Sequence, residues 1–568
     1  MPSLTNSLGL LTAGTLFAAC AVAAEPPDGG AQVRPEAGIA WKQAANDADV
    51  DAAFAQARQA QKPVFVYWGA KWCPPCNQVK ATLFNRQDFI ERSRAFVPVY
   101  VDGDSPGAQK LGTRFKVRGY PTMVLFTPQG TELTRLPGEV DAEQYTQVLT
   151  LGMNAQRPVK AVLADALAGG EPASRLSAND WKLLAFYSWE TDEQQVVPKD
   201  GVPTLLRKLA DRCPADQAET ATRLLLKAVA AAGTPAAAPP GSKPAAKPVT
   251  APATPPAAPP ATFPDAAARD KLLQLLADPA RPRVHMDVLT NNAADLVHAL
   301  SAARTPERAQ LVAALNTALK RLAADSTLSR ADRMTAVIAQ VDLAKLGADR
   351  GAPPPQAAKN AKEVKVVLPA ALLAEVRDHT ARADREITDG YERQAVITTA
   401  AYMLEQAGLL DESDTLLKAN LAKSHSPYYL MSDLASNAKK RGDKAGALRW
   451  YEEAFNKSEG PATRLQWGAS YVSALVELAP QDEARVEKAA GQVLAEAAGQ
   501  PNAFYERSAR SLQRVGSRLM GWNEGGKHAG VLTRLQAQLN TVCLRLDAAD
   551  PQRGVCDGLL RPAPKKAA

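Results

Sequence analysis

The sequence has little net charge for its length and lacks any block of basic residues. Its 568 residues include 67 lysines and arginines against 60 aspartates and glutamates, a formal charge of +7. A nucleic acid is usually bound through a dense basic patch, and so mild a charge, spread along the chain, supplies none. We therefore expect no nucleic-acid partner.

Long apolar runs are also absent, except at the N-terminus. Residues 8–24, LGLLTAGTLFAACAVAA, are uncharged, short for a membrane span, and end with Val22 and Ala24 at the −3 and −1 positions of a signal-peptidase site. No lysine or arginine precedes them, which departs from the usual signal. We predict a cleaved signal peptide over residues 1–24 and export to a bacterial periplasm. The alternatives are a lipoprotein modified at Cys20 and a retained membrane anchor.

Cysteine is scarce, and its positions restrict how it can pair. The six cysteines are Cys20, Cys73, Cys76, Cys213, Cys543 and Cys556. Without Cys20, which the signal would remove, five remain, one more than two pairs require. Cys73 and Cys76 are a natural local pair, whereas Cys543 and Cys556 flank a short turn and are candidates for a structural disulfide. Cys213 is then left as an unpaired, buried thiol. A periplasmic location permits such bonds.

Residues 72–76, WCPPC, leave three uses open: half a zinc site, a structural loop, or thiol–disulfide exchange. Zinc needs four ligands, but the sequence has no second CxxC motif. The five histidines are scattered, with no metal-binding or catalytic spacing: His285, His298, His379, His425 and His528. We therefore expect no metal and no cofactor, and the flanking chain must decide between the other two uses.

The chain around WCPPC alternates between strand and helix patterns. Residues 63–69 are an apolar, β-rich run that predicts a buried strand, and the residues after the motif have helical spacing. The cysteines therefore lie where a strand passes into a helix. A second strand begins near residue 96, and a short helix, a strand broken at its start by Pro121, another strand and a helix follow. With a strand at residues 39–41 and a helix before the motif, this order predicts an α/β domain over residues 38–153.

Two motifs in this domain resemble those of the thioredoxin superfamily. They are WCPPC after a buried strand and GYPT at residues 119–122. The flanking segments KPVFVYWGAKWCPPC and FNRQDFI are similar to the periplasmic thioredoxin-like C-terminal domain of the transmembrane electron carrier DsbD. The resemblance implies that Cys73 is an exposed nucleophile, Cys76 is the buried resolving thiol, and the two form a redox-active disulfide beside a cis-proline at Pro121. It covers only residues 38–153.

The predicted place of Cys73 explains its expected reactivity. A thiolate, not a thiol, attacks a disulfide, and a helix N-terminus lowers the pKa of a thiol through its dipole and unpaired amide groups. Pro74 and Pro75 are tolerated in the first helical turn, but they remove two N–H donors. We therefore expect a moderately activated thiol that depends on the dipole and on the amides of Cys76 and Asn77.

The resemblance also implies a substrate-binding surface. Tyr120 and Thr122 would offer backbone groups to a bound peptide, and Trp72 would pack against the motif. One departure stands out, because the family's buried acid, six residues before the first cysteine, is Tyr67 here. Lys80 likewise replaces an acid of the DsbD domain; it either favours the thiolate by its charge or is an ordinary solvated lysine.

Beyond residue 155 the strand patterns end and alanine- and leucine-rich helical patterns take over. A chain of this length is expected to form two to four domains. We predict two helical segments, two Pro/Ala-rich linkers and a TPR-like (tetratricopeptide-like) helical domain: 155–232 helical, 233–263 linker, 264–348 helical, 349–364 linker and 365–560 TPR-like.

The repeat in the last segment rests on Gly408 and Gly442, which lie 34 residues apart, the period of a TPR helix pair. Such pairs stack into a curved surface that binds extended peptides or helices. Aromatic side chains such as Tyr429 and Trp450 could line that groove, or these helices pack only on each other.

Taken together, the sequence predicts an α/β thioredoxin fold followed by a mainly α-helical, TPR-like region with Pro/Ala linkers. The predicted function is an exported thiol–disulfide oxidoreductase that acts on protein disulfides through the CPPC dithiol, in the reductive direction. Its partners would be client proteins with thiols or disulfides and a membrane electron donor or acceptor. The alternative is a TPR-type binding or scaffold protein of the cell envelope with an accessory redox pair.

Overall fold

The computed structural model describes residues 38–138, 140–155, 157–192, 195–233, 265–348 and 366–561. The signal peptide predicted over 1–24 and the linker predicted over 349–364 lie outside these ranges, as does the linker over 233–263 apart from Gly233. Within the described ranges, no helix combines the length and the apolar character needed to cross a bilayer.

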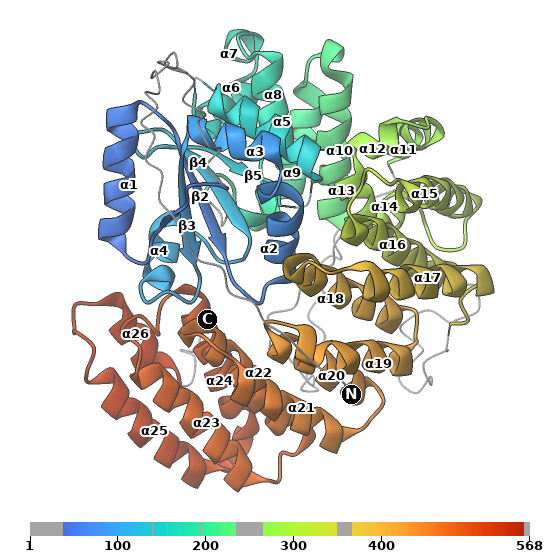
Figure 1. The fold of residues 1–568 in the computed structure, drawn as a ribbon. Coiled ribbons are helices and arrows are strands. Elements are labelled where there is room, and N and C mark those ends of the chain that lie inside the picture. Colours follow the sequence, from blue (N-terminus) through green and yellow to red (C-terminus); the bar gives the residue numbers. More distant parts are fainter. Residues whose placement is uncertain are drawn as a thin grey trace, which may run out of the picture. The chain divides into compact units, whose positions relative to one another are not determined.

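A five-stranded sheet lies at the centre of the N-terminal part (Figure 1). The strand order is β1-β3-β2-β4-β5, in which β1, β3 and β2 are parallel, β4 is antiparallel to β2, and β5 is antiparallel to β4. The bounds are β1 Lys42–Gln43, β2 Val64–Gly69, β3 Val97–Asp102, β4 Thr122–Phe126 and β5 Glu132–Leu136. The predicted α/β fold is confirmed, with the first strand displaced from residues 39–41 to β1.

Both faces of the sheet are covered, and β2 is buried along its whole length. Val66 and Trp68 pack in one core with α1 (Asp47–Ala60), whereas Phe65 and Tyr67 pack in the core on the opposite face. Figure 1 shows α1 on one side of the sheet and α2 on the other. An uninterrupted apolar run is what a strand covered on both faces requires, which is why VFVYWG forms β2.

The helical stretch expected after WCPPC is divided into four pieces. They are α2 Pro74–Val79, a π-helical turn over Lys80–Phe84, α3 Gln87–Arg92 and a 3-10 turn over Ser93–Ala95. Arg86 has an extended backbone, and its guanidinium binds the carboxylate of Asp88 at 2.8 and 2.9 Å. Because Asp88 lies in the first turn of α3, where a negative charge is favourable, the helix restarts there.

The helices that follow the sheet continue its core. Buried residues of α8, among them Trp181 and Leu184, belong to the same apolar cluster as Phe65 on the sheet and Tyr145 on α5. The bounds are α5 Ala142–Met153, α6 Val159–Ala168, α7 Gly170–Ser174, α8 Ala178–Phe186, α9 Val202–Arg212 and α10 Ala218–Gly233. The earlier helix α4, Ala108–Phe115, lies between β3 and β4 and packs in the core with α1. One face of the sheet and the helices α5, α6, α8, α9 and α10 therefore share one hydrophobic core.

The remaining described residues are helical, as the sequence predicts. Residues 265–348 form α11 Ala266–Ala277, α12 Arg281–Val284, α13 Met286–Asn291, α14 Ala293–Leu300, α15 Pro306–Ala324 and α16 Arg330–Ala348. Residues 366–561 form α17 Ala370–Glu386, α18 Gly390–Gln406, α19 Leu410–Asn420, α20 Pro427–Lys440, α21 Lys444–Lys457, α22 Pro461–Leu478, α23 Glu483–Ala498, α24 Glu506–Trp522, α25 Ala529–Cys543 and α26 Pro551–Gly558.

The two glycines of the proposed repeat occupy equivalent turns. Gly408 lies between α18 and α19 and Gly442 between α20 and α21, with φ of 78° and 79°. Each donates its N–H to the carbonyl three residues earlier, at 2.9 and 3.0 Å, and the residue after each donates to the carbonyl five residues earlier. A left-handed backbone of this kind favours glycine. The spacing of 34 residues thus marks a repeated helix–turn–helix unit, while its assignment to the TPR family stays a prediction.

Candidate dithiol–disulfide site

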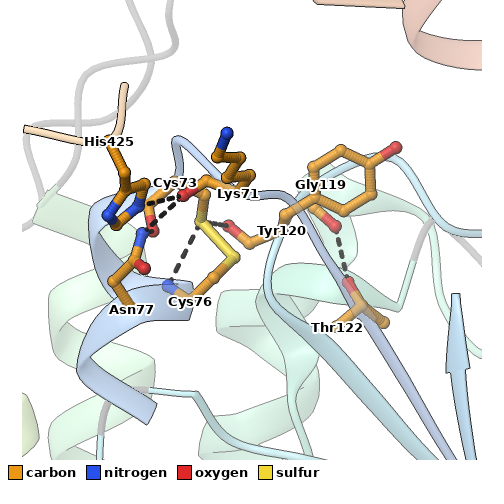
Figure 2. Close-up of a disulfide and its surroundings, with 8 residues drawn as sticks. All are labelled: Lys71, Cys73, Cys76, Asn77, Gly119, Tyr120, Thr122 and His425. Carbon is orange, nitrogen blue, oxygen red and sulfur yellow. Dashed lines mark hydrogen bonds between the residues drawn. A yellow bond between two sulfur atoms is a disulfide. The ribbon is translucent and has the colours of Figure 1, made fainter. Parts of the chain in front are cut away.

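The two cysteines of WCPPC lie at the junction of β2 and α2 (Figure 2). Cys73 is the N-cap residue of α2 and is joined to Cys76 in a disulfide whose Cα atoms are 5.2 Å apart. The backbone N–H of Cys76 points at Cys73 Sγ, 3.2 Å away. Pro74 and Pro75 fill the first two helical positions and have no N–H to offer. The amide of Cys76 and the helix field are therefore the groups that can stabilise a Cys73 thiolate.

Asn77 fixes the loop that leads into α2. Its side-chain amide donates to the carbonyl oxygens of Lys71 and Cys73, both at 2.8 Å, and the side chain is fully buried. Figure 2 shows these bonds on the side of the motif that faces His425. Because both acceptors belong to the motif or its immediate flank, Asn77 holds the backbone of the nucleophile in place.

The GYPT segment lies against the disulfide. The Tyr120–Pro121 peptide bond is cis, and the carbonyl oxygen of Tyr120 is 3.5 Å from Cys73 Sγ. Thr122 is buried, and its hydroxyl donates to the carbonyl of Gly119 at 2.9 Å, so its side chain is directed back into its own loop (Figure 2). The structure thus brings WCPPC and GYPT together, and the roles of Tyr120 and Thr122 in substrate binding stay predictions.

Cys73 is not exposed, contrary to the expectation from the family resemblance. Only 2% of its surface is accessible, and Cys76 is completely buried. Cys73 packs in the apolar cluster on one face of the sheet. Side chains of the helical region contact Trp72, the residue before Cys73. Trp72 stacks on Tyr429 at 5.9 Å between ring centroids and meets the edge of Trp467 at 5.1 Å.

Arg507 of α24 completes this cover. Its guanidinium lies 4.4 Å from the ring centroid of Trp72 and 5.3 Å from that of Tyr120, both at cation–π distance. Its backbone N–H donates to the side-chain oxygen of Gln109 at 3.0 Å, and its side chain binds Gln466. Burial lowers the pKa of the Arg507 guanidinium. We call Tyr429, Trp467 and Arg507 the aromatic cover.

A second contact anchors the helical region beside the site. The carboxylate of Asp104, after β3, accepts the backbone N–H of Thr463 at 2.7 Å and its hydroxyl at 2.6 Å. Burial raises the pKa of Asp104, and the two bonds from Thr463 oppose that shift. Gly460 permits the approach, because a Cβ atom at this position would lie 2.4 Å from the Asp104 carboxyl carbon. The start of α22 is therefore bound to the thioredoxin-like part.

His425 is the histidine that approaches the site. Its Nε2 is 3.0 Å from the carbonyl oxygen of Lys71, and a carbonyl only accepts, so Nε2 carries the proton. Burial lowers the pKa of His425, the bond to the Lys71 carbonyl opposes this, and the charges of Lys71 and Lys80 lower it further. The scattered spacing of the histidines in the sequence gives no signal of this position. In the part of the chain that the structure describes, no three His, Cys, Asp or Glu side chains gather as metal ligands.

Tyr67 occupies the position of the family's buried acid and cannot replace a carboxylate. It is 1% exposed, and its hydroxyl has no hydrogen-bond partner among the described residues. Burial, followed by the influence of Tyr100 and Asp102, raises the pKa of its phenol. The hydroxyl fits because Gly69 has no side chain; a Cβ there would lie 2.5 Å from the Tyr67 oxygen. A neutral phenol therefore occupies the position of the family's buried acid.

Lys80 is not a solvated lysine. Its ammonium group lies 5.6 Å from the ring centroid of Tyr100 and 5.2 Å from that of Tyr391 on α18. Burial lowers its pKa, while Asp102 opposes the shift. From the sequence alone, Lys80 is either an ordinary solvated lysine or a cation that favours the thiolate. The structure places its largely enclosed ammonium group one turn after Cys76.

The remaining cysteines have distinct environments. Cys543, the last residue of α25, is joined to Cys556 of α26 in a disulfide, and both are buried. Cys213 is free and only half-buried, whereas the sequence led us to expect a buried thiol. It lies at the C-terminal end of α9, where the helix has ended. Burial, with a smaller effect of Asp216, raises its pKa to about 11.

The family comparison agrees with this geometry. Residues 50–152 match the family model of a thioredoxin-like domain. The sheet, the CxxC-spaced disulfide at the β2–α2 junction and the adjoining GYPT loop all lie in or beside that range. The N-terminal part of the chain is therefore a thioredoxin-like domain.

Curated relatives give a more particular likeness. The chain is 33% identical over 106 residues to the thiol:disulfide interchange protein DsbD 1 of Pseudomonas aeruginosa, which is 18% of each chain. It is 32% identical over 116 residues to the DsbD protein of Yersinia pestis, which is 20% of this chain and 19% of that protein. The likeness thus spans about a fifth of these relatives' length.

Proposed function

We propose that the protein is a thiol–disulfide oxidoreductase whose redox centre is the Cys73–Cys76 pair. The observation that carries this proposal is the disulfide at the N-terminus of α2, with the Cys76 amide at 3.2 Å from Cys73 Sγ. A structural loop needs no such placement, whereas a thiolate is stabilised by it. The thioredoxin-like family match supports the same chemistry.

The exchange would proceed in two steps. In the reduced protein, the Cys73 thiolate attacks one sulfur of a client disulfide, forming a mixed disulfide and releasing the other client sulfur as a thiolate. Cys76 loses its proton and attacks Cys73 Sγ, which restores the Cys73–Cys76 bond and releases the second client thiolate. Two electrons pass from the dithiol to the client. Tyr67 offers no carboxylate to take the Cys76 proton, so that proton leaves by another route.

We further propose that the protein works after export to the periplasm, in the reductive direction, with a membrane electron donor. This rests on the predicted signal peptide over residues 1–24 and on the similarity to the DsbD proteins. The roles of Cys73 as nucleophile, Cys76 as resolving thiol and Pro121 as the adjoining cis-proline belong to the same proposal.

The alternative, a TPR-type scaffold with an accessory redox pair, draws on the repeated turns at Gly408 and Gly442. Against it, Tyr429 and Trp467 contact Trp72, so part of the surface that would bind a partner is used within the chain. A scaffold would bind its partners equally well with Cys73 and Cys76 replaced by alanine.

The test is a redox titration of the full-length protein against mixtures of reduced and oxidised glutathione. After denaturation, free thiols are tagged with a heavy maleimide and counted on a gel. We expect one pair of thiols to appear and disappear reversibly, and to be lost in the Cys73→Ser variant. The proposal is wrong if the pair stays oxidised at every ratio, or if the reduced protein reduces no disulfide faster than Cys73→Ser does.

A further inference from the structure

A pocket of about 580 Å³ lies between α2 and the helical region. Its lining includes Gln78 of α2, Glu143 of α5, Thr290 of α13 and Asp332 of α16, but neither cysteine of the redox pair. Its size is within the range of about 300–1,000 Å³ that is usual for ligand pockets. The pocket is therefore separate from the dithiol, and the chemistry of its own wall determines what it can bind.

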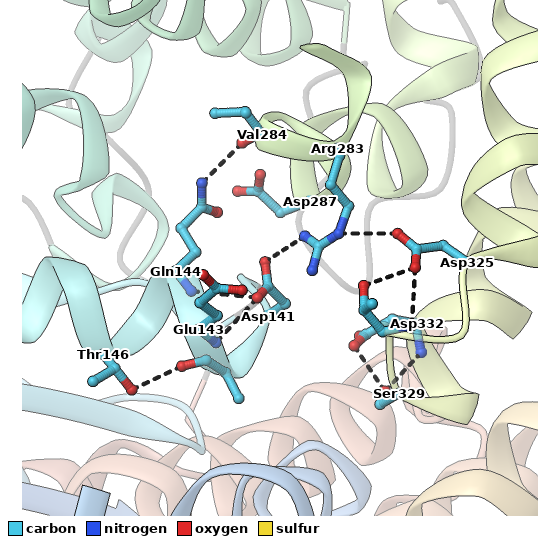
Figure 3. A network of polar contacts seen from close by, with 12 residues as sticks. Asp141, Glu143, Gln144, Thr146, Arg283, Val284, Asp287, Asp325, Ser329 and Asp332 are labelled. Atoms are coloured by element: carbon cyan, nitrogen blue, oxygen red, sulfur yellow. Dashed lines mark hydrogen bonds and ion pairs between the residues drawn. The ribbon is translucent and has the colours of Figure 1, made fainter. Parts of the chain in front are cut away.

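The two guanidinium groups in the wall are already paired with carboxylates. Arg86 binds Asp88 at 2.8 Å. Arg283 binds Asp141, at the start of α5, at 2.8 Å and Asp325 at 3.1 Å, as Figure 3 shows. Neither cation is thus left for an anionic ligand, and Arg283 is matched by two negative charges.

Two further carboxylates of the wall, those of Glu143 and Asp332, form no ion pair within the described ranges. Asp332 accepts hydrogen bonds only from neutral groups, the side-chain amide of Gln78 and the hydroxyl of Ser329, both at 2.7 Å. Burial raises the pKa of Asp332, these two bonds oppose the shift, and the negative charge of Asp141 raises it further. A cation in the pocket would relieve this repulsion between carboxylates.

Thr290 is a second and independent sign of a ligand. It lines the pocket and is 5% exposed, yet its hydroxyl has no hydrogen-bond partner among the described residues. Thr335 and Thr399, in the same wall, bond the carbonyl four residues earlier in their helices, at 3.0 and 2.9 Å. A buried polar group without a partner costs free energy. The Thr290 hydroxyl can therefore accept a hydrogen bond from a ligand.

Much of the remaining wall is apolar. Buried side chains that line the pocket are Val79, Leu83, Tyr145, Met286 and Leu328. Such a surface favours a hydrocarbon chain. A bare metal ion does not match this wall, because no group of three His, Cys, Asp or Glu side chains is placed to bind one in the described part of the chain. Acidic and apolar groups together indicate an organic cation.

We propose that this pocket binds an organic cation, an ammonium or guanidinium group carried on a short aliphatic chain. The charged group donates hydrogen bonds to the Asp332 carboxylate and the Thr290 hydroxyl, and the chain lies along the apolar wall. The cation is either a free small amine or the lysine or arginine side chain of a polypeptide. The proposal goes beyond the redox function and does not depend on it.

The experiment measures binding to the full-length protein, with both disulfides intact, by isothermal titration calorimetry. The probes are hexylammonium and hexylguanidinium, with 1-hexanol as the neutral analogue and hexanoate as the anionic one. We expect the cations to bind and both analogues to bind at least about tenfold more weakly. The proposal is wrong if either analogue binds as tightly as the cations, or if neither cation binds at about 10 mM.

A short peptide with a single lysine identifies the source of the cation. If it binds at least about tenfold more tightly than hexylammonium, the natural ligand is a side chain of a polypeptide. If it binds no more tightly, the natural ligand is a free amine. In both cases the same peptide with its lysine acetylated should bind far more weakly than the unmodified one. Equal binding of the two peptides would contradict a site for a cation.

The variant Asp332→Asn tests the charge, because asparagine keeps the size of aspartate and one acceptor oxygen. We expect the affinity for hexylammonium to fall at least about tenfold. Asp342→Asn is the matched control and should change nothing, since Asp342 is also half-buried on α16 but does not line the pocket. Thr290→Val, which removes the unpartnered hydroxyl, should weaken binding about threefold.

An unchanged affinity in Asp332→Asn, or the same loss in Asp342→Asn, overturns the proposal. Circular dichroism checks that each variant keeps the parental fold. If Asp332→Asn does not fold, the comparison of the cations with 1-hexanol in the parent protein still decides the outcome. The glutathione titration of the parent is a separate measurement, so a failure of the redox proposal is distinguished from a failure of this one.

Discussion

The two disulfides of the protein are alike in burial and differ in their position on the helices. Their Cα separations are 5.2 and 5.6 Å, and all four cysteines are at most 2% exposed. Cys73 begins a helix, where the field favours a thiolate, whereas Cys543 ends one, where the field opposes it. Burial alone therefore does not distinguish the proposed redox disulfide from the proposed structural one, whereas the helix end at which Cys73 or Cys543 lies does.

The largest effect should come from removing one cysteine of the first pair. Cys76→Ala leaves nothing to resolve a mixed disulfide, so covalent complexes with clients should accumulate, whereas Cys73→Ala should give almost none. A non-reducing gel of exported proteins from cells expressing each full-length variant measures this. Cys543→Ala is the matched control and should trap no client. Equal trapping by Cys73→Ala and Cys76→Ala would remove the distinction between the two cysteines.

The free thiol should be the least reactive cysteine at neutral pH. With the pKa of Cys213 raised to about 11, its thiolate fraction at pH 8 is about one in a thousand. Because deprotonation generates the nucleophile, its alkylation rate should rise about tenfold per pH unit from pH 7 to 10. Mass spectrometry of iodoacetamide-treated protein, with both disulfides intact, follows this single site. A rate that is already flat at pH 8 would contradict the raised pKa.

Loss of the second disulfide should loosen the C-terminus without affecting exchange. Its loop is longer, with a sequence separation of 13 against 3, and closing a loop of that size contributes about 3 kcal/mol. The double variant Cys543→Ala/Cys556→Ala should show about a hundredfold faster hydrogen exchange in α26. Its redox titration should match the parent. Unchanged exchange in α26 would mean that packing, and not the bond, holds this helix.

The smallest predicted effect concerns access to the first pair. Trp467→Ala removes the ring whose edge meets Trp72, an interaction of about 1 kcal/mol. Maleimide labelling of Cys73 in the reduced protein should become about five- to tenfold faster. Trp522→Ala is the control, because that ring stacks on His528 in another part of the helical region. Equal acceleration by both variants would indicate general loosening and not removal of the aromatic cover.

The sequence predicts the sheet and the position of the dithiol well, because these depend on local pattern. The apolar run at Val64–Gly69, the CPPC spacing and the turn residues carry their own signals. The break at Arg86 carries no such signal, since a helical spacing of apolar residues continues through it. Local sequence signals therefore predict helices, strands and motifs, but they predict the ends of the helices less reliably.

The burial of Cys73 could not be predicted from the sequence. Tyr429, Trp467 and Arg507, which contact the neighbouring Trp72, lie more than three hundred positions along the chain, and contacts at such separation leave no periodic pattern. The aromatic composition near Tyr429 suggested a groove, which was a partial signal. The enclosure of Lys80 by Tyr391 has the same origin. Which surfaces of the N-terminal domain the helical region buries is therefore set by tertiary packing.

The order in which the chain is made gives the aromatic cover a further consequence. The sheet and the helices that share its core are complete at Gly233, and Tyr429 follows 429 − 233 = 196 residues later. At synthesis rates of about 5–20 residues per second, those residues take about 10–40 seconds to appear. In a chain that emerges N-terminus first, the newborn protein thus has an interval in which Trp72 lacks these contacts. Until those residues appear, the rings of Tyr429 and Trp467 do not cover Trp72.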